Sequence, residues 1–170
     1  MLIPARIPPH KPVDEEPGVE HRLEMCRLAV SGDEERFEVS DVEARRAGPS
    51  YTVDTLEELH SRKPDSELFL IVGGDVAVGF PSWREPERVL SLATLAVAER
   101  PGTGRRAVEL ALGQVRGGDQ ARFFDMPEIG ISSTMLRDRA GRGEPTRYLV
   151  PDAVRSYIDR HQLYGGSATK

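Results

Sequence analysis

The sequence has a single cysteine, Cys26, and only four histidines, which are scattered along the chain. One thiol cannot form an intramolecular disulfide, and Cys26 lies in an apolar helical pattern, so we expect a small buried side chain there. These residues match no metal-ligand spacing, so we predict no structural zinc site and no metal-ligating residue. The sequence also lacks a GxSxG motif, which leaves a hydrolase with little support.

Long apolar runs are missing as well. No stretch approaches the ~18 apolar residues of a membrane helix, and the N-terminal "MLIPARIPPHK" has no signal-peptide core. The net charge of −5 argues against a general nucleic-acid surface, because such a surface needs a basic stripe. We therefore expect a cytoplasmic protein that binds neither membranes nor nucleic acid.

What the sequence has is an alternation of apolar strands and amphipathic helices, in a chain of 170 residues. The predicted strands are "ELFLIVGGD", "TLAVAERPG" and "ARFFDMP", and the continuous apolar run of the first indicates burial on both faces of a sheet. A weaker, imperfectly alternating pattern in "RFEVSDVEA" predicts a further strand.

Helices are predicted around these strands by the 3.6-residue period of apolar side chains and by their punctuation. They cover residues 19–31, a segment from Tyr51 or Thr52 to just before Lys63, residues 85–92, residues 106–115, and a last helix with Pro151 at its first position. This order predicts an α/β fold with a parallel sheet and helices on both faces, which binds ligands at the carboxyl ends of the strands. Residues 1–164 are predicted to form one domain, and 165–170 a disordered tail.

A cluster of hydroxyl side chains, Ser132, Ser133 and Thr134, precedes two arginines in "GISSTMLRDR". One interpretation is a simple helix cap, because Ser and Thr are preferred at that position. The other is a phosphate site, since a helix N-terminus attracts anions and Arg137 or Arg139 would add positive charge. The stretch by itself favours capping.

Three further segments have a structural and a functional interpretation. After the first buried strand, Gly74 and Asp75 of "FLIVGGD" would either form a tight turn with Asp75 as helix cap, or bring the backbone and a carboxylate to a ligand. Trp83 would either lie partly buried under a loop or stack on a heteroaromatic ring. Tyr51 and Thr52 begin a helix whose N–H groups suit an anion, although Asp54 in the first turn opposes one.

In this order, "IPPHK", "EHRLEMCRLA", "RFEVS", "GPSYTVDTL", "LFLIVGGD", "PSW", "ERPG", "ISSTMLR" and "RYLVPDAVRSYI" resemble the bacterial nicotinate-nucleotide adenylyltransferase family, from about Ile3 to Tyr164. The resemblance implies a Rossmann-like nucleotidyltransferase fold. It also implies that ATP and nicotinate mononucleotide are converted to deamido-NAD and pyrophosphate in NAD biosynthesis, with Mg²⁺ bridging phosphate oxygens. Assembly into a homo-oligomer stays open.

The resemblance assigns roles to residues by their match to the family's motifs. Ser133, Thr134 and Arg137 match the segment that binds ATP phosphates, with Ser132 as its cap. The residues that match the mononucleotide site are His10, Lys11, Tyr51, Thr52, Gly74, Asp75 and Trp83. Among these, Tyr51 and Thr52 match the segment that receives the nicotinate carboxylate, Trp83 the aromatic residue on the pyridine ring, and His10 and Lys11 the loop near the phosphate.

The resemblance also implies an N-terminal strand, a Gly-rich turn and a His-x-Gly-His motif, none of which the sequence contains. We therefore predict a fold that is N-terminally incomplete, lacking its first βα unit, in a sequence that is part of a longer chain. No catalytic residue is assigned. The alternatives are a truncated, inactive nucleotide-binding or interaction module of the same fold, and a sister transferase for nicotinamide mononucleotide or phosphopantetheine.

Overall fold

The computed structural model describes residues 1–9, 17–99, 104–127 and 129–165. The chain divides into two compact units: unit 1 comprises Met1–Ser50 and Gly130–Lys170, and unit 2 comprises Tyr51–Ile129. His10 and Lys11, and the predicted tail apart from Gly165, lie outside the described residues. The extent of the predicted domain, 1–164, stays a prediction.

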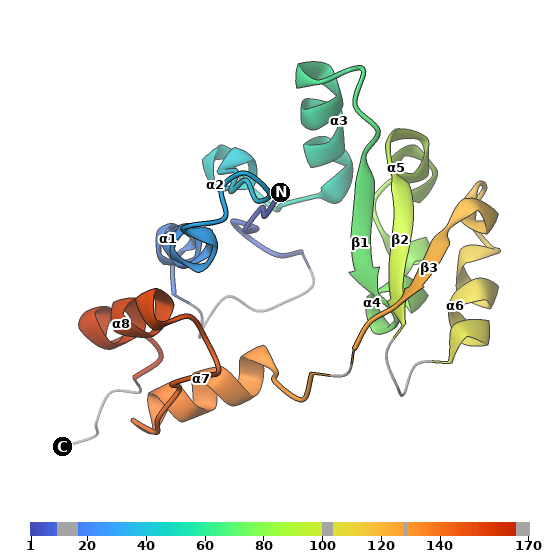
Figure 1. The fold of residues 1–170 in the computed structure, drawn as a ribbon. Coiled ribbons are helices and arrows are strands. Elements are labelled where there is room, and N and C mark those ends of the chain that lie inside the picture. Colours follow the sequence, from blue (N-terminus) through green and yellow to red (C-terminus); the bar gives the residue numbers. More distant parts are fainter. Residues whose placement is uncertain (10–16, 100–103, 128, 166–170) are drawn as a thin grey trace. The chain divides into compact units, whose positions relative to one another are not determined.

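Unit 2 is built on a three-stranded parallel sheet in the order β1–β2–β3 (Figure 1). The strands are β1 (Phe69–Gly73), β2 (Thr94–Glu99) and β3 (Arg122–Asp125). The register aligns Val72 with Val97 and Val97 with Phe123, so these side chains share one face. The predicted parallel α/β fold and its three strands are therefore confirmed.

The helices of unit 2 also follow the prediction. They are α3 (Thr52–Arg62), α4 (Gly74–Val78), α5 (Pro86–Leu92) and α6 (Arg105–Leu112), with short 3₁₀ turns η1 (Phe80–Ser82) and η2 (Gly118–Gln120). Helix α6 ends three positions earlier than expected, at Leu112, and Gly113 follows it as the C-cap. These helices supply Val53, Ala77, Phe80, Val89 and Val108 to the core cluster that contains Val72, Leu95 and Val97 of the sheet.

The first strand differs from the prediction of burial on both faces. Val72 is buried, but Phe69 is 44% and Ile71 is 68% exposed. The cause is the face on which they lie, since Phe69 and Ile71 point away from the core cluster to which Leu70 and Val72 contribute. The central strand β2 fits the prediction better, because Leu95, Ala96, Val97 and Ala98 are all buried.

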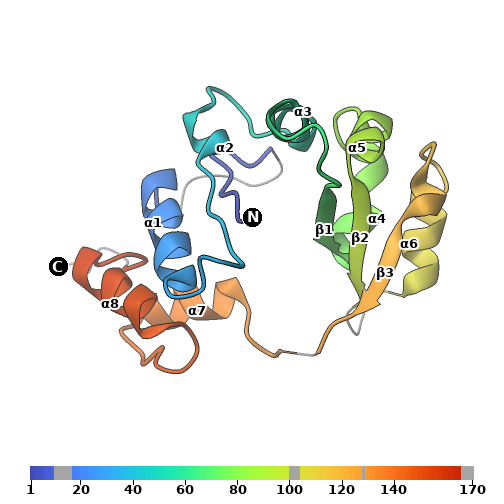
Figure 2. The same ribbon diagram turned by 45° about the horizontal axis from the view of Figure 1, so that its top comes forward.

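Unit 1 consists mainly of helices: α1 (Val19–Val30), α2 (Val42–Arg45), α7 (Ser133–Gly141) and α8 (Asp152–His161), with α1 beside α8 (Figure 2). His21 of α1 and Tyr157 of α8 are hydrogen-bonded, with 3.0 Å between Nδ1 and the phenol oxygen. Leu23 and Val154 on the same two helices are buried. None of the helices formed by the described residues has the length and apolar character that a membrane crossing requires.

Two local predictions for unit 1 were wrong. The segment "RFEVSDVEA" forms no strand; only Val39 pairs, in an isolated parallel bridge to Leu2, and α2 begins at Val42. The reason is that Phe37 is exposed while Val42 is buried from a helix, so the apparent alternation does not define one sheet face. Pro151 is the N-cap of α8 rather than its first residue.

Candidate active site

The turn after β1 brings Gly73, Gly74 and Asp75 to the carboxyl end of the sheet. Gly73 is the N-cap of α4 and Gly74 is buried in its first turn, so the prediction that Asp75 is the cap was wrong. The exposed Asp75 folds back instead: a Cβ placed on Gly73 would lie 2.6 Å from its Oδ1. Glycine at position 73 therefore leaves room for this carboxylate at the strand end.

Trp83 follows η1, and its position is set by the core beneath it. Its ring centroid lies 5.1 Å from that of Phe80 at an interplanar angle of 45°, and Phe80 is fully buried. The Trp83 N–H donates to the Phe80 carbonyl at 3.0 Å. Because Trp83 remains half-buried, partial burial under the loop is confirmed, while its stacking on a ligand ring stays a prediction.

The start of α3 holds Tyr51 as N-cap and Thr52 as first residue, with extended backbone at Tyr51. A cation that the sequence interpretation missed lies there: the Arg84 Cζ is 4.7 Å from the centroid of the Tyr51 ring. Arg84 Nη1 also lies 3.6 Å from Asp54 Oδ2, so the acidic charge expected to oppose an anion has a basic partner. The only signal in the sequence was the position of Arg84 directly after Trp83.

Helix α7 carries the predicted phosphate-binding residues in unit 1. Ser132 is its N-cap, and the hydroxyl accepts a hydrogen bond from the Met135 N–H at 3.1 Å, which confirms the predicted cap. Ser133 and Thr134 are exposed in the first turn, which contains no acidic residue. The helix start therefore presents no carboxylate of its own to an anion, in contrast to α3 with Asp54.

The two arginines of α7 have different surroundings. Arg139 donates to the Pro145 carbonyl from Nε at 3.1 Å and from Nη2 at 2.9 Å, and its Nη1 lies 3.1 Å from Glu144 Oε2, so it holds the turn after the helix. Arg137 and Ser133 instead line a cavity of about 230 Å³ within unit 1. The other lining residues are Met25, Leu136, Thr146, Val150, Val154, Ile158 and Tyr164. Of the two, Arg137 is thus the arginine that shares a cavity with a hydroxyl of the cluster.

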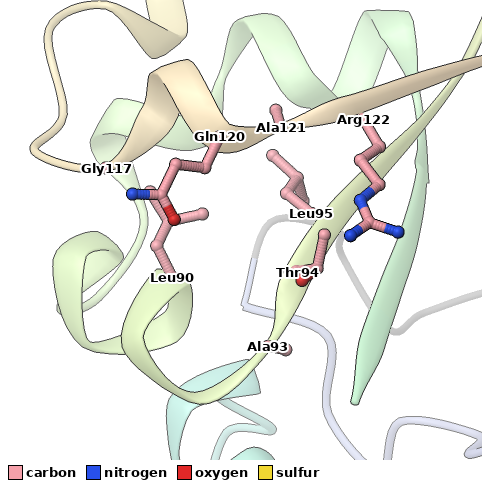
Figure 3. A pocket seen from close by; sticks show the side chains of 8 residues that line it. All are labelled: Leu90, Ala93, Thr94, Leu95, Gly117, Gln120, Ala121 and Arg122. Atoms are coloured by element: carbon pink, nitrogen blue, oxygen red, sulfur yellow. The ribbon is translucent and has the colours of Figure 1, made fainter. Parts of the chain in front are cut away.

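A second cavity, of about 140 Å³, lies in unit 2 but at the other end of the sheet (Figure 3). Thr94 and Arg122, which begin β2 and β3, line it together with Gln120. Ligands of open parallel sheets bind at the carboxyl ends of the strands, so this cavity is not part of the candidate site.

Within unit 2, the structure brings Tyr51 and Thr52 together with the loop of Trp83 and Arg84, and both Tyr51 and Trp83 pack on the core cluster. Gly74 and Asp75 follow β1 of the same unit. Ser132, Ser133, Thr134 and Arg137 belong to unit 1. Their assignment to two substrates stays a prediction at this point.

The family described as Cytidylyltransferase-like matches residues 1–139. A protein of Synechococcus sp. (strain JA-3-3Ab) named "Probable nicotinate-nucleotide adenylyltransferase" is 40% identical over 96% of this chain and 79% of its own length. One of the same name from Desulfitobacterium hafniense (strain Y51) is 42% identical over 96% of this chain and 80% of its own. This chain belongs to the nicotinate-nucleotide adenylyltransferases.

A solved structure supports the fold of this nicotinate-nucleotide adenylyltransferase family member. The nicotinic acid mononucleotide adenylyltransferase of Plasmodium falciparum, complexed with NaAD, matches with a TM-score of 0.74 over 95% of this chain and 80% of that chain. A structure of that enzyme complexed with APC matches with a TM-score of 0.67 over 85% of this chain and 75% of that one. At 17% and 18% identity, the likeness confirms the Rossmann-like fold and is silent on individual site residues.

Proposed function

We propose that this chain transfers the adenylyl group of ATP to nicotinate mononucleotide, giving deamido-NAD and pyrophosphate, as a step of NAD biosynthesis. The observation that carries the proposal is the identity to two members of the family, 40% and 42% over 96% of this chain. The fold agrees, because its parallel sheet places a glycine turn and a carboxylate at the strand end where such folds bind nucleotides.

In the proposed arrangement, residues of unit 2 bind the mononucleotide. Tyr51 and Thr52 receive the nicotinate carboxylate, Trp83 packs against the pyridine ring, and Gly74 and Asp75 approach the nucleotide from the end of β1. The half-buried Trp83 is suited to this role, because its ring is anchored on Phe80 and cannot readily turn away. His10 and Lys11 are proposed to lie near the mononucleotide phosphate.

Residues of unit 1 are proposed to bind the ATP phosphates. Ser132 caps α7, which leaves the N–H groups and hydroxyls of Ser133 and Thr134 to meet phosphate oxygens. Arg137, one turn further along α7, adds a permanent positive charge on the same cavity as Ser133. The absence of an acidic residue in the first turn of α7 supports an anion at this helix start rather than a simple cap.

The reaction itself requires no general base from the protein. A phosphate oxygen of the mononucleotide forms a bond to the α-phosphorus of ATP, and the bond to pyrophosphate breaks, with the electron pair leaving on pyrophosphate. That nucleophile is already anionic at neutral pH, so the protein contributes mainly positioning and charge stabilisation.

We propose Mg²⁺ as a companion of ATP. Among the described residues, no group of three or more His, Cys, Asp or Glu side chains is arranged to hold a metal ion. Phosphate oxygens of the substrate would therefore supply most of the ligands, which is how Mg²⁺ is commonly bound.

Pyrophosphate release from ATP, Mg²⁺ and nicotinate mononucleotide tests the proposal directly. We expect turnover that depends on both nucleotides and yields deamido-NAD. Binding of both nucleotides without turnover would support the inactive module instead. Turnover with phosphopantetheine but not with the mononucleotide would identify a sister transferase.

A further inference from the structure

Arg84 is a charged side chain among the proposed mononucleotide residues that has no role in the function above. It follows Trp83 in the chain, and its guanidinium lies over the ring of Tyr51, 4.7 Å from the centroid. Half of its surface is exposed, so a bound molecule can reach it. Arg84 is thus adjacent in the chain to Trp83, proposed to pack on the pyridine ring, and contacts Tyr51, proposed to receive the carboxylate.

The backbone around Arg84 is held from both sides. On one side the Trp83 N–H is bonded to Phe80, in the centre of the core. On the other side Glu85 adopts a left-handed conformation, φ 51° and ψ 57°, and Pro86 begins α5. A left-handed non-glycine residue is uncommon and is kept only where the surroundings determine it. The backbone from which the Arg84 side chain reaches α3 is therefore constrained on both sides.

The ion pairs of Arg84 are long compared with those of its neighbour Arg88. Arg84 lies 3.6 Å from Asp54 and 3.5 Å from Glu85, whereas Arg88 Nε donates to Glu57 of α3 at 2.9 Å. A charge-assisted hydrogen bond is typically about 2.7–2.9 Å long. The carboxylates around Arg84 therefore balance its charge without forming short bonds to it, and a ligand carboxylate is able to form such bonds.

We infer that Arg84 is a specificity-determining residue, whose guanidinium over Tyr51 selects a pyridine mononucleotide with a carboxylate rather than a carboxamide. This inference rests on the proposed function. Nicotinate carries a negative charge and two equivalent acceptor oxygens, which match the paired donors of a guanidinium. Nicotinamide is neutral and offers one acceptor, and its amide N–H groups would face a cation.

Arg84→Met tests this, because methionine keeps an unbranched side chain over Tyr51 but removes the charge. We expect kcat/KM for nicotinate mononucleotide to fall about tenfold or more. This is the lower end of the range for the loss of a charge-assisted hydrogen bond, because the Arg84 side chain is half exposed and solvent screens its charge. With nicotinamide mononucleotide kcat/KM should stay the same or rise, and KM for ATP should not change. Arg84→Lys should restore part of the preference. An equal loss with both mononucleotides, or no loss, would overturn the inference.

Arg88→Met is the matched control, because Arg88 also links this part of the chain to α3 but bonds to Glu57 rather than contacting Tyr51. It should leave the ratio of the two mononucleotides unchanged, and a change as large as that of Arg84→Met would also overturn the inference. Titration of each mononucleotide, followed by the fluorescence of Trp83, gives the dissociation constants without turnover. If the wild-type chain binds the mononucleotides but does not react, the proposed function fails, while the ratio of the two dissociation constants in wild type and Arg84→Met still tests the inference. If the chain binds neither mononucleotide, the proposed function and the inference both fail.

Discussion

The two units differ in how their side chains are buried. Every residue of the main core cluster lies in unit 2, and its sheet residues Val72, Leu95 and Val97 share one face. The expected helix layer on the other face stays a prediction. Among the described residues of unit 1, the buried apolar side chains are Leu23, Val42, Ala44 and Val154. Of the two cavities described above, unit 1 contains the larger, and α7 has no fully buried residue.

This difference matches the division of labour that we propose. Recognition of a pyridine ring needs a rigid surface, and Trp83 and Tyr51 are both supported by the core of unit 2. Binding of phosphates depends more on charge and helix N–H groups, which a surface helix such as α7 can provide. The better-packed unit thus carries the residues proposed to choose the substrate.

The largest expected effect is on the free energy of unfolding, when one buried side chain is truncated in each unit. Phe80→Ala, in unit 2, should lower the free energy of unfolding by about 3–5 kcal/mol, because it leaves a cavity under Trp83. Leu23→Ala, in unit 1, should cost about 2–5 kcal/mol, less than Phe80→Ala because a smaller buried side chain is removed. Urea unfolding followed by far-UV circular dichroism measures both.

Trp83, the only tryptophan, makes this test specific, because its fluorescence reports on unit 2. Leu23→Ala should move the circular dichroism transition and leave the midpoint of the fluorescence transition unchanged. If Leu23→Ala shifts both transitions equally, the two units unfold as one cooperative structure and the comparison fails.

Arg137→Ala tests whether unit 1 binds ATP independently of the mononucleotide site proposed in unit 2. The variant should weaken ATP binding by about 1.5–3 kcal/mol, the range for a charge-assisted bond, and leave the affinity for nicotinate mononucleotide unchanged. Calorimetric titration with each nucleotide measures this. Arg142→Ala is the control, because Arg142 is a more exposed cation at the far end of α7. Unchanged ATP affinity would remove Arg137 from the proposed phosphate site.

A smaller effect is expected from the cap of α7. Ser132→Ala removes the acceptor for the Met135 N–H and should cost about 1 kcal/mol of stability. The loss should lower the midpoint of the unfolding transition followed by circular dichroism. The midpoint followed by Trp83 fluorescence should not change. Ser133→Ala, which leaves the capping bond intact, should cost less. If the two variants are equally destabilised, the cap does not stabilise α7.

The sequence predicted those features that depend on local patterns. The apolar run of β2, the helix start at Thr52 and the cap at Ser132 all follow from residues that are near in the chain, and the structure has each of them. The family resemblance was also readable, because it depends on an ordered set of such local motifs.

Features that depend on distant contacts were missed. The apolar run of β1 could not reveal that Ile71 would be exposed, because exposure is decided by what packs beside a strand and not by its own composition. Arg84 was overlooked for the same reason, since its contact is with Tyr51, which is far away in the chain. The failed strand near Val39 shows that imperfect alternation alone does not specify a sheet partner.

The smallest effect concerns Cys26 on α1. Burial raises the pKa of this thiol, and the positive charge of Arg22 opposes the change less strongly. A raised pKa leaves less thiolate at a given pH, so alkylation by iodoacetamide at mildly alkaline pH should be slower than that of free cysteine. The rise of the rate with pH should also have its midpoint above the ordinary value for a thiol.

The same reaction gives a local probe of unit 1. If unit 1 opens more easily than unit 2, urea too dilute to change Trp83 fluorescence should already accelerate the alkylation of Cys26, because an exposed thiol regains its ordinary pKa. A rate that stays constant until the fluorescence changes would mean that α1 opens only with unit 2. In that case the small number of buried apolar side chains in the described part of unit 1 would have no counterpart in local stability.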